Sequence, residues 1–237
     1  MIVAENITFK HILRGVSISI PDHGVTGLVG PNGSGKTTLL RCLFGALKIS
    51  GGKVEINGKD LNSYRPRELA GEIAVVAQDS GEPPQISVAE IVRLGNIASG
   101  GQNDEIIYDS LARLGMEDRA TSYLNQLSGG ERQRVMIARG FAQASRHLLF
   151  DEPTNHLDIR YQLEVLHEIS KYPRSVTVVL HDLNFALQYC DYVYLLAEGE
   201  IVAAGEPKEV FQPEILEPVY DVRVTMRDGI LRFERKK

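Results

Sequence analysis

The sequence has no tryptophan, and its 237 residues include only two cysteines, Cys42 and Cys190. Neither cysteine has a metal-ligand neighbour at standard spacing, and no Cys-x-x-Cys pair occurs, so the signatures of structural zinc sites and of disulfide frameworks are missing. Both cysteines lie in apolar helical patterns. We therefore expect two buried free thiols.

Long apolar runs are also missing, since none reaches the roughly 18–20 residues that a membrane-spanning helix requires. Residues 1–6 lack the basic-then-apolar layout of a secretion signal. The formal net charge of −5 argues against general affinity for nucleic acid. We expect a cytoplasmic protein that has no nucleic acid partner and reaches a membrane only through another chain.

The residues that are present describe an ordinary globular protein, with 43% apolar and 24% charged residues. Short strand patterns come first, and strands and helices then alternate, which favours an α/β fold with a mostly parallel sheet. The predicted strands are 2–9, 16–20, 25–29, 51–58, 73–77, 147–150 and 176–180, and the predicted helices are 38–47 and 159–170. Segments 192–196 and 201–204 flank Glu198-Gly199-Glu200 and predict a hairpin.

Residues from about 85 to 140 look helical throughout, with glycine breaks. We expect a single domain over 1–237, with a catalytic core of 1–84 and 141–237 and an inserted helical subdomain of about 85–140.

A phosphate-binding loop follows the predicted strand 25–29 and precedes the predicted helix 38–47, which is the context that this motif requires. Its glycines let several backbone N–H groups face one point, and the helix N-terminus adds a positive dipole end. Lys36 would contact the β- and γ-phosphates, and the Thr37 hydroxyl would ligate Mg²⁺. The predicted nucleotide-binding residues are Gly30, Pro31, Asn32, Gly33, Ser34, Gly35, Lys36, Thr37 and Thr38.

Two carboxylates end the apolar strand 147–150, at the edge of the sheet where open α/β folds bind ligands. We expect Asp151 to hold Mg²⁺ directly or through water, and Glu152 to position or deprotonate the attacking water. An acidic surface turn before Pro153 is the structural alternative.

A second anion-binding surface is predicted where Leu127-Ser128-Gly129-Gly130-Glu131 opens a helix. Ser128 and Glu131 have the spacing of a capping box, so an ordinary helix start is the alternative. Two glycines in the first turn favour a binding role, because each costs helix stability and bares backbone N–H groups.

Taken in this order, the phosphate loop, the Leu-Ser-Gly-Gly-Glu segment and the Asp-Glu strand resemble ATP-binding cassette (ABC) proteins over nearly the whole chain. The resemblance implies a P-loop NTPase core with an N-terminal antiparallel β part and an inserted helical subdomain. It implies ATP hydrolysis with Mg²⁺, and contacts from Ser128, Gly129, Gly130 and Glu131 to the ATP of a partner subunit.

The resemblance also implies four further positions. Gln78 matches a glutamine that contacts Mg²⁺ or water, and His181 matches the switch histidine that contacts the γ-phosphate. Asp158 matches the D-loop that crosses to the partner, although it could instead cap the next helix. The family places an aromatic residue against adenine, and Phe9 is the candidate, although the spacing before Ile12 is compressed here.

Family members pair head to tail around two ATPs, so we expect a homodimer on the cytoplasmic face of the cell membrane, bound to an integral membrane permease and indirectly served by a substrate-binding protein. The segments 153–159, 180–184 and 201–207 resemble ATPase subunits of importers for iron–siderophore complexes, haem or cobalamin. Two alternatives are a soluble ABC ATPase of iron–sulfur cluster assembly and the ATPase of an exporter or lipoprotein-release system.

Overall fold

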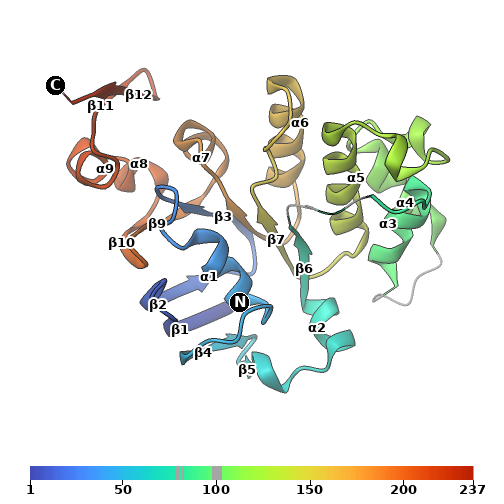
Figure 1. Cartoon of the computed structure of the whole chain (residues 1–237), viewed down its shortest axis with the longest axis horizontal. Coiled ribbons are helices and arrows are strands. Elements are labelled where there is room, and N and C mark those ends of the chain that lie inside the picture. Colours follow the sequence, from blue (N-terminus) through green and yellow to red (C-terminus); the bar gives the residue numbers. More distant parts are fainter. Residues whose placement is uncertain (78–80, 82, 98–102, 237) are drawn as a thin grey trace. The chain divides into compact units, whose positions relative to one another are not determined.

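The computed structural model describes residues 1–77, 81, 83–97 and 103–236 (Figure 1). The chain forms two compact units. The first unit contains Met1–Ser63 and Thr177–Lys237, and the second contains Tyr64–Val176. The predicted inserted subdomain lies within the second unit, and its boundaries stay a prediction.

An antiparallel sheet opens the first unit, with the strand order β2-β1-β4-β5. Ile2 lies opposite both Ile20 and Ile56, and all three side chains are fully buried. Alternating apolar residues thus give this sheet one face toward the core. The strands are β1 (Ile2–Phe9), β2 (Leu13–Ile20), β4 (Gly51–Ile56) and β5 (Lys59–Asp60).

The first unit also contains neighbouring strands in the order β10-β9-β3-β8, with β8 included from Thr177 onward. Strand β3 pairs in parallel with β9, and β9 and β10 form the predicted antiparallel hairpin. Strands β3 and β8 are buried along nearly their whole length, which is typical of strands covered on both faces. These strands are β3 (Gly24–Val29), β8 (Ser175–Val179), β9 (Tyr192–Ala197) and β10 (Glu200–Gly205).

The remaining elements of the first unit include the helix after the phosphate loop, which ends at Leu43 rather than at the predicted residue 47. Gly45 has a φ of +78°, and this left-handed turn stops the helix. The elements are α1 (Lys36–Leu43), a 3-10 turn (Leu61–Ser63), α7 (Leu183–Tyr189), α8 (Pro207–Val210), α9 (Pro213–Tyr220), β11 (Val222–Arg227) and β12 (Ile230–Arg235).

The second unit contains the parallel pair β6 and β7, in which Ile73 lies opposite His147. Helix α2 was not predicted from the sequence, and α6 has the predicted bounds. The elements are α2 (Pro66–Glu72), β6 (Ile73–Val76), α3 (Val88–Asn96), α4 (Asp104–Ala112), 3-10 turns at Glu117–Arg119 and Leu124–Gln126, α5 (Gly129–Ala142), β7 (His147–Asp151) and α6 (Ile159–Ser170).

The expectation that residues 85–140 are helical throughout is wrong for the stretch between α4 and α5. Gly115 has a φ of +60°, and only the two short 3-10 turns interrupt the loop that follows. The α/β class, with parallel strands and an N-terminal antiparallel sheet, is confirmed.

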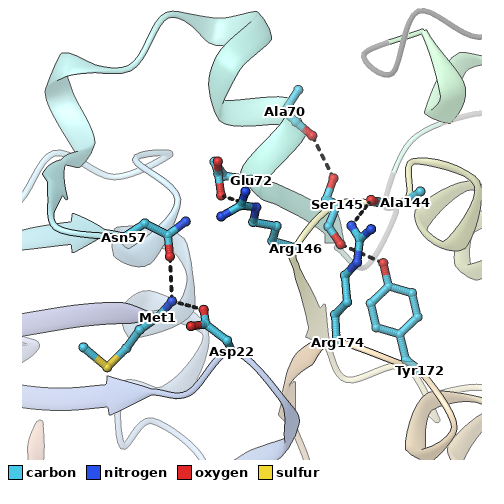
Figure 2. A network of polar contacts seen from close by, with 10 residues as sticks. All are labelled: Met1, Asp22, Asn57, Ala70, Glu72, Ala144, Ser145, Arg146, Tyr172 and Arg174. Atoms are coloured by element: carbon cyan, nitrogen blue, oxygen red, sulfur yellow. Dashed lines mark hydrogen bonds and ion pairs between the residues drawn. The ribbon is translucent and has the colours of Figure 1, made fainter.

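Polar contacts fix the ends of several elements in each unit (Figure 2). In the second unit, Ser145 Oγ donates to the Ala70 carbonyl at 2.7 Å, and Tyr172 Oη donates to the Ser145 carbonyl at 2.8 Å. In the first unit, the Met1 ammonium donates to Asn57 Oδ1 at 2.7 Å and also contacts the Asp22 carboxylate. The start of β7 is therefore anchored to the end of α2.

Both cysteines are buried free thiols, as predicted. Burial raises the pKa of Cys42 to about 11 and that of Cys190 to about 12. Among the helices of the described ranges, none combines the length and the apolar character that crossing a membrane demands.

Candidate functional site

The phosphate loop of the first unit depends on two glycine conformations. Gly30 has a φ of +146°, and a Cβ atom there would lie 2.1 Å from the Leu196 carbonyl oxygen. Gly35 has a φ of +105° at the N-cap of α1, and its Cβ atom would lie 2.9 Å from Leu13 Cδ2. No other residue type fits either position without moving its neighbours. The loop is therefore packed against β2 and β9, which hold its backbone in place.

Lys36 is 5% exposed, and its Nζ donates to the carbonyls of Gly30 at 2.8 Å and Pro31 at 2.9 Å. The ammonium group is thus held inside the loop rather than directed into solvent. Thr37 and Thr38 lie half-buried in the first turn of α1, where the helix dipole favours an anion. Asn32 and Gly33 are exposed at the tip of the loop.

A cavity of about 640 Å³ borders the outer side of the loop. Residues that the sequence analysis did not single out form much of its wall, among them Arg14, Val202 and Val219. The backbone N–H of Arg14 donates to the Gly199 carbonyl at 2.9 Å, and the N–H of Gly199 donates to Ser34 at 3.1 Å. The hairpin turn between β9 and β10 therefore joins β2 to the phosphate loop.

Phe9 and His181 also lie in the first unit. The Phe9 ring is 7% exposed, and the Lys10 ammonium lies 5.2 Å from its centroid. Stacking on adenine requires an open ring face, and the role of Phe9 stays a prediction. His181 follows β8, is exposed, and borders a cavity of about 540 Å³ together with Tyr220 and Phe233.

The two carboxylates after β7 lie in the second unit in different environments. Asp151 ends a fully buried strand and is 4% exposed. Glu152 is half-buried and has a φ of +55°, a left-handed conformation that is unfavourable for a glutamate. Its carboxylate accepts a hydrogen bond from Asn155 Nδ2. The carboxylate of Glu152 therefore has a defined orientation.

The start of α5 has the predicted capping box. Ser128 Oγ accepts from the Glu131 N–H at 3.3 Å, and the Glu131 carboxylate accepts from the Ser128 N–H at 2.9 Å. These bonds to Ser128 lower the pKa of Glu131. Ser128 and Gly129 are exposed, and nothing lies within 4 Å of a Cβ atom built on Gly129. The N-terminus of α5 is therefore open to an incoming group.

The segment after Glu152 packs on this helix start within the same unit. A Cβ atom on Gly130 would lie 3.3 Å from Leu157 Cδ2. Residues 128–131, Leu157 and Asp158 border a common cavity of about 320 Å³. Asp158 occupies the N-cap position of α6, but its side chain makes no capping hydrogen bond. The alternative that Asp158 simply caps α6 is thus supported by its position at the helix start but not by its side chain.

The structure divides the predicted site residues between its two units. The phosphate loop, Phe9 and His181 belong to the first unit, whereas Asp151, Glu152, the residues 128–131 and Asp158 belong to the second. Gln78 lies outside the described residues. Sequence reasoning gave no individual role to Asn155, although its amide contacts Glu152. Its place three residues after the glutamate was the available signal, because such a turn brings the two side chains together.

Comparisons with known proteins point to one family. The family model described as "ABC transporter" matches residues 13–155. A hemin import ATP-binding protein of Rhizobium meliloti (strain 1021) is 36% identical over 236 residues, covering 94% of this chain and 90% of the relative. The ferric enterobactin transport ATP-binding protein of Escherichia coli (strain K12) is 35% identical over 237 residues, covering 95% of this chain and 84% of the relative.

Among solved structures, a dimeric ATP-binding cassette in a post-hydrolysis state with ADP and Pi superposes with a TM-score of 0.79. It is 26% identical, and the match covers 87% of this chain and 99% of that one. The chain belongs to the ABC transporter family. It is an ATP-binding ATPase subunit with a P-loop NTPase fold.

Proposed function

We propose that this chain pairs head to tail with a second copy and powers the import of a metal chelate through a separate membrane permease. The cargo class is an iron–siderophore complex, haem or cobalamin. The observation that carries this proposal is the similarity to hemin and ferric enterobactin import subunits, which extends over more than nine-tenths of the chain.

The phosphate loop binds the triphosphate of ATP in this proposal. Backbone N–H groups of residues 32–37 face the β-phosphate, and Lys36, held by the Gly30 and Pro31 carbonyls, supplies positive charge to the β- and γ-phosphates. Thr38 lies one residue further into α1, next to the α-phosphate position. The adenine ring of ATP would lie beside Phe9.

The donor set fits Mg²⁺, since the Thr37 hydroxyl and the Asp151 carboxylate are hard oxygen ligands. Within the described residues, no group of three or more His, Cys, Asp or Glu side chains could hold a metal by itself. Mg²⁺ commonly binds together with nucleotide phosphates and keeps few protein ligands. Mg²⁺ neutralises phosphate charge when it is bound. Gln78 is the third proposed ligand and also contacts the attacking water.

Glu152 acts as the base that orients and deprotonates the attacking water, and His181 donates to the γ-phosphate. Ser128 and the N–H groups of Gly129 and Gly130 stabilise the phosphoryl charge of the ATP that is bound by the other copy. Glu131 fixes Ser128 through the capping box. Asp158 crosses to the phosphate loop of the other copy.

One chain thus offers two phosphate-binding helix ends, and two copies complement each other around two ATPs with two-fold symmetry. ATP closes the pair because it binds the closed state more tightly, and hydrolysis removes the bridging γ-phosphate. The driven partner is an integral membrane permease, served by a substrate-binding protein. The ATPase would lie on the cytoplasmic face of the membrane.

Affinity capture of the tagged Glu152→Gln chain from detergent-solubilised membranes tests this proposal, with partners identified by mass spectrometry. We expect the variant to bind ATP, to lose at least about 100-fold in turnover, and to recover a permease with many membrane-spanning helices. Lys36→Ala serves as the control, because it should lose nucleotide affinity and recover less permease.

Recovery of soluble partners alone would replace the transport proposal with cluster assembly and leave the ATPase chemistry intact. Recovery of an export or lipoprotein-release permease would keep the transport role and overturn the direction of import. Normal turnover by Glu152→Gln would remove Glu152 from the role of base.

A further inference from the structure

The turn that follows β7 holds two non-glycine residues in the left-handed region. Glu152 has a φ of +55° and His156 has a φ of +62°. Such conformations are unfavourable for residues with a Cβ atom and persist only where surrounding contacts impose them. The contacts around Glu152 therefore indicate how the carboxylate of this proposed catalytic base is oriented.

Asn155 makes two of these contacts. Its Nδ2 donates to the carboxylate of Glu152, and its backbone N–H donates to the Glu152 carbonyl at 3.2 Å. A hydrogen bond to an ionised acceptor is stronger and more directional than a neutral one. The amide therefore limits the rotation of the Glu152 carboxylate, whereas the backbone bond only closes the turn.

Other residues hold the turn independently of the Asn155 side chain. Gln162 Nε2 donates to the Thr154 carbonyl at 3.2 Å, and the N–H of Leu157 donates to the same carbonyl at 3.4 Å. Leu157 also packs near Gly130 at the start of α5. Loss of the Asn155 amide would thus remove one restraint on the Glu152 carboxylate while the backbone path of the turn stays in place.

We propose that Asn155 is a positioning residue that orients the Glu152 carboxylate toward the attacking water. This inference rests on the proposed role of Glu152 as the base. Asn155 and His156 also border a cavity of about 270 Å³ together with Gly129 and Arg132 of α5. Asn155, which orients the catalytic base for the ATP bound by its own chain, therefore lies beside the start of α5, which contacts the ATP bound by the other copy.

The test compares Asn155→Ala and Asn155→Asp with Gln162→Ala in the purified chain. Asn155→Asp keeps the side-chain shape but removes the donor and adds a repelling carboxylate. Gln162→Ala is the matched control, because it removes a side-chain donor to the same turn and leaves the Asn155 amide in place. Asn155→Ser restores a shorter donor.

We expect kcat to fall about 10- to 100-fold in Asn155→Ala, since a base displaced by about 1 Å loses catalysis on that scale. It should fall further in Asn155→Asp and recover partly in Asn155→Ser. KM and the affinity for a non-hydrolysable ATP analogue should stay within about twofold of the original chain. Gln162→Ala should keep kcat within about twofold.

A kcat within twofold of the original chain in both Asn155→Ala and Asn155→Asp would overturn the proposal. So would an equal loss in Gln162→Ala, because that result assigns the effect to the turn as a whole. Glu152→Gln separates the positioning role of Asn155 from the role of Glu152 as the catalytic base. If it is inactive while the Asn155 variants are normal, only the positioning role falls, whereas a fully active Glu152→Gln removes the base as well.

Discussion

The two helix ends that we propose to bind phosphate are constructed differently. At the start of α1, Gly30 and Gly35 have positive φ values, and Gly30 leaves only 2.1 Å between a Cβ atom and the Leu196 carbonyl. At the start of α5, nothing lies within 4 Å of a Cβ atom built on Gly129, and a Ser128–Glu131 capping box stabilises the first turn. The first end requires glycine for folding, whereas the second can fold without it.

This difference separates Gly30 and Gly35, which the backbone conformation requires, from Gly129, to which we assign a functional role. The backbone of the phosphate loop is under tight steric control from Leu196 and Leu13, and the proposed ligand of this loop is bound by the same chain. The start of α5 is an exposed helix end that carries a Ser128–Glu131 capping box. Gly129 leaves room for a group that approaches from outside the chain, as the proposed head-to-tail pair requires.

The matched pair Gly30→Ala and Gly129→Ala tests the contrast most strongly. Gly30→Ala should lower the free energy of unfolding by about 3 kcal/mol, because the methyl group meets backbone in a φ region that alanine disfavours. Gly129→Ala should change it by less than about 0.5 kcal/mol. Denaturant unfolding monitored by circular dichroism measures both values.

The same two variants differ in a second measurement. Gly129→Ala should keep nucleotide affinity but lower turnover about tenfold, because the methyl group occupies the space proposed for the partner's γ-phosphate. Equal stability losses in the two variants would remove the structural distinction between the ends. Full turnover by Gly129→Ala would remove the functional one.

Ser128→Ala has a smaller expected effect, and Ser87→Ala is its matched control. Ser87 and Glu90 form the same capping box at the start of α3, with a Glu90 N–H to Ser87 Oγ distance of 3.3 Å, as at Ser128. Each variant should lose about 1 kcal/mol of stability. Only Ser128→Ala should also lower ATP turnover, and a similar loss in Ser87→Ala would reduce Ser128 to an ordinary cap.

The smallest expected effect concerns pH. Hydrogen bonds to Ser128 lower the folded-state pKa of Glu131 below its ordinary value of 4.5. The stabilisation is therefore present above about pH 4.5 and is lost as pH falls through the lower folded-state pKa. Glu131→Gln should cost less than about 1 kcal/mol near neutral pH, and this cost should shrink as pH falls through the folded-state pKa of Glu131. A cost that is independent of pH would contradict the assignment.

The sequence predicted the α/β class and the strands that carry the site residues, because glycine turns and apolar runs report the backbone directly. The bounds of β1 and α6 agree with the prediction. The loop between α4 and α5 was predicted to be helical, because its apolar spacing resembles a helix and only tertiary packing selects the 3-10 turns.

Contacts between side chains were the part that sequence reasoning could not reach. The bond from Asn155 to Glu152 depends on a left-handed glutamate, which no pattern of residue types predicts. The position of Arg14 beside the phosphate loop depends on how the turn at Gly199 packs against β2. Such arrangements come from register and packing, which the order of residues determines only through the whole fold.

Because Cys42 and Cys190 are buried, they do not need to be replaced before a label is attached at a newly introduced cysteine. With pKa values of about 11 and about 12, both thiols stay protonated near neutral pH and react slowly with maleimides. A single cysteine introduced at exposed Ala46, outside the proposed nucleotide site, would therefore accept a spin label or fluorophore selectively. Distances between two such labels could follow the association of two copies during each ATP turnover.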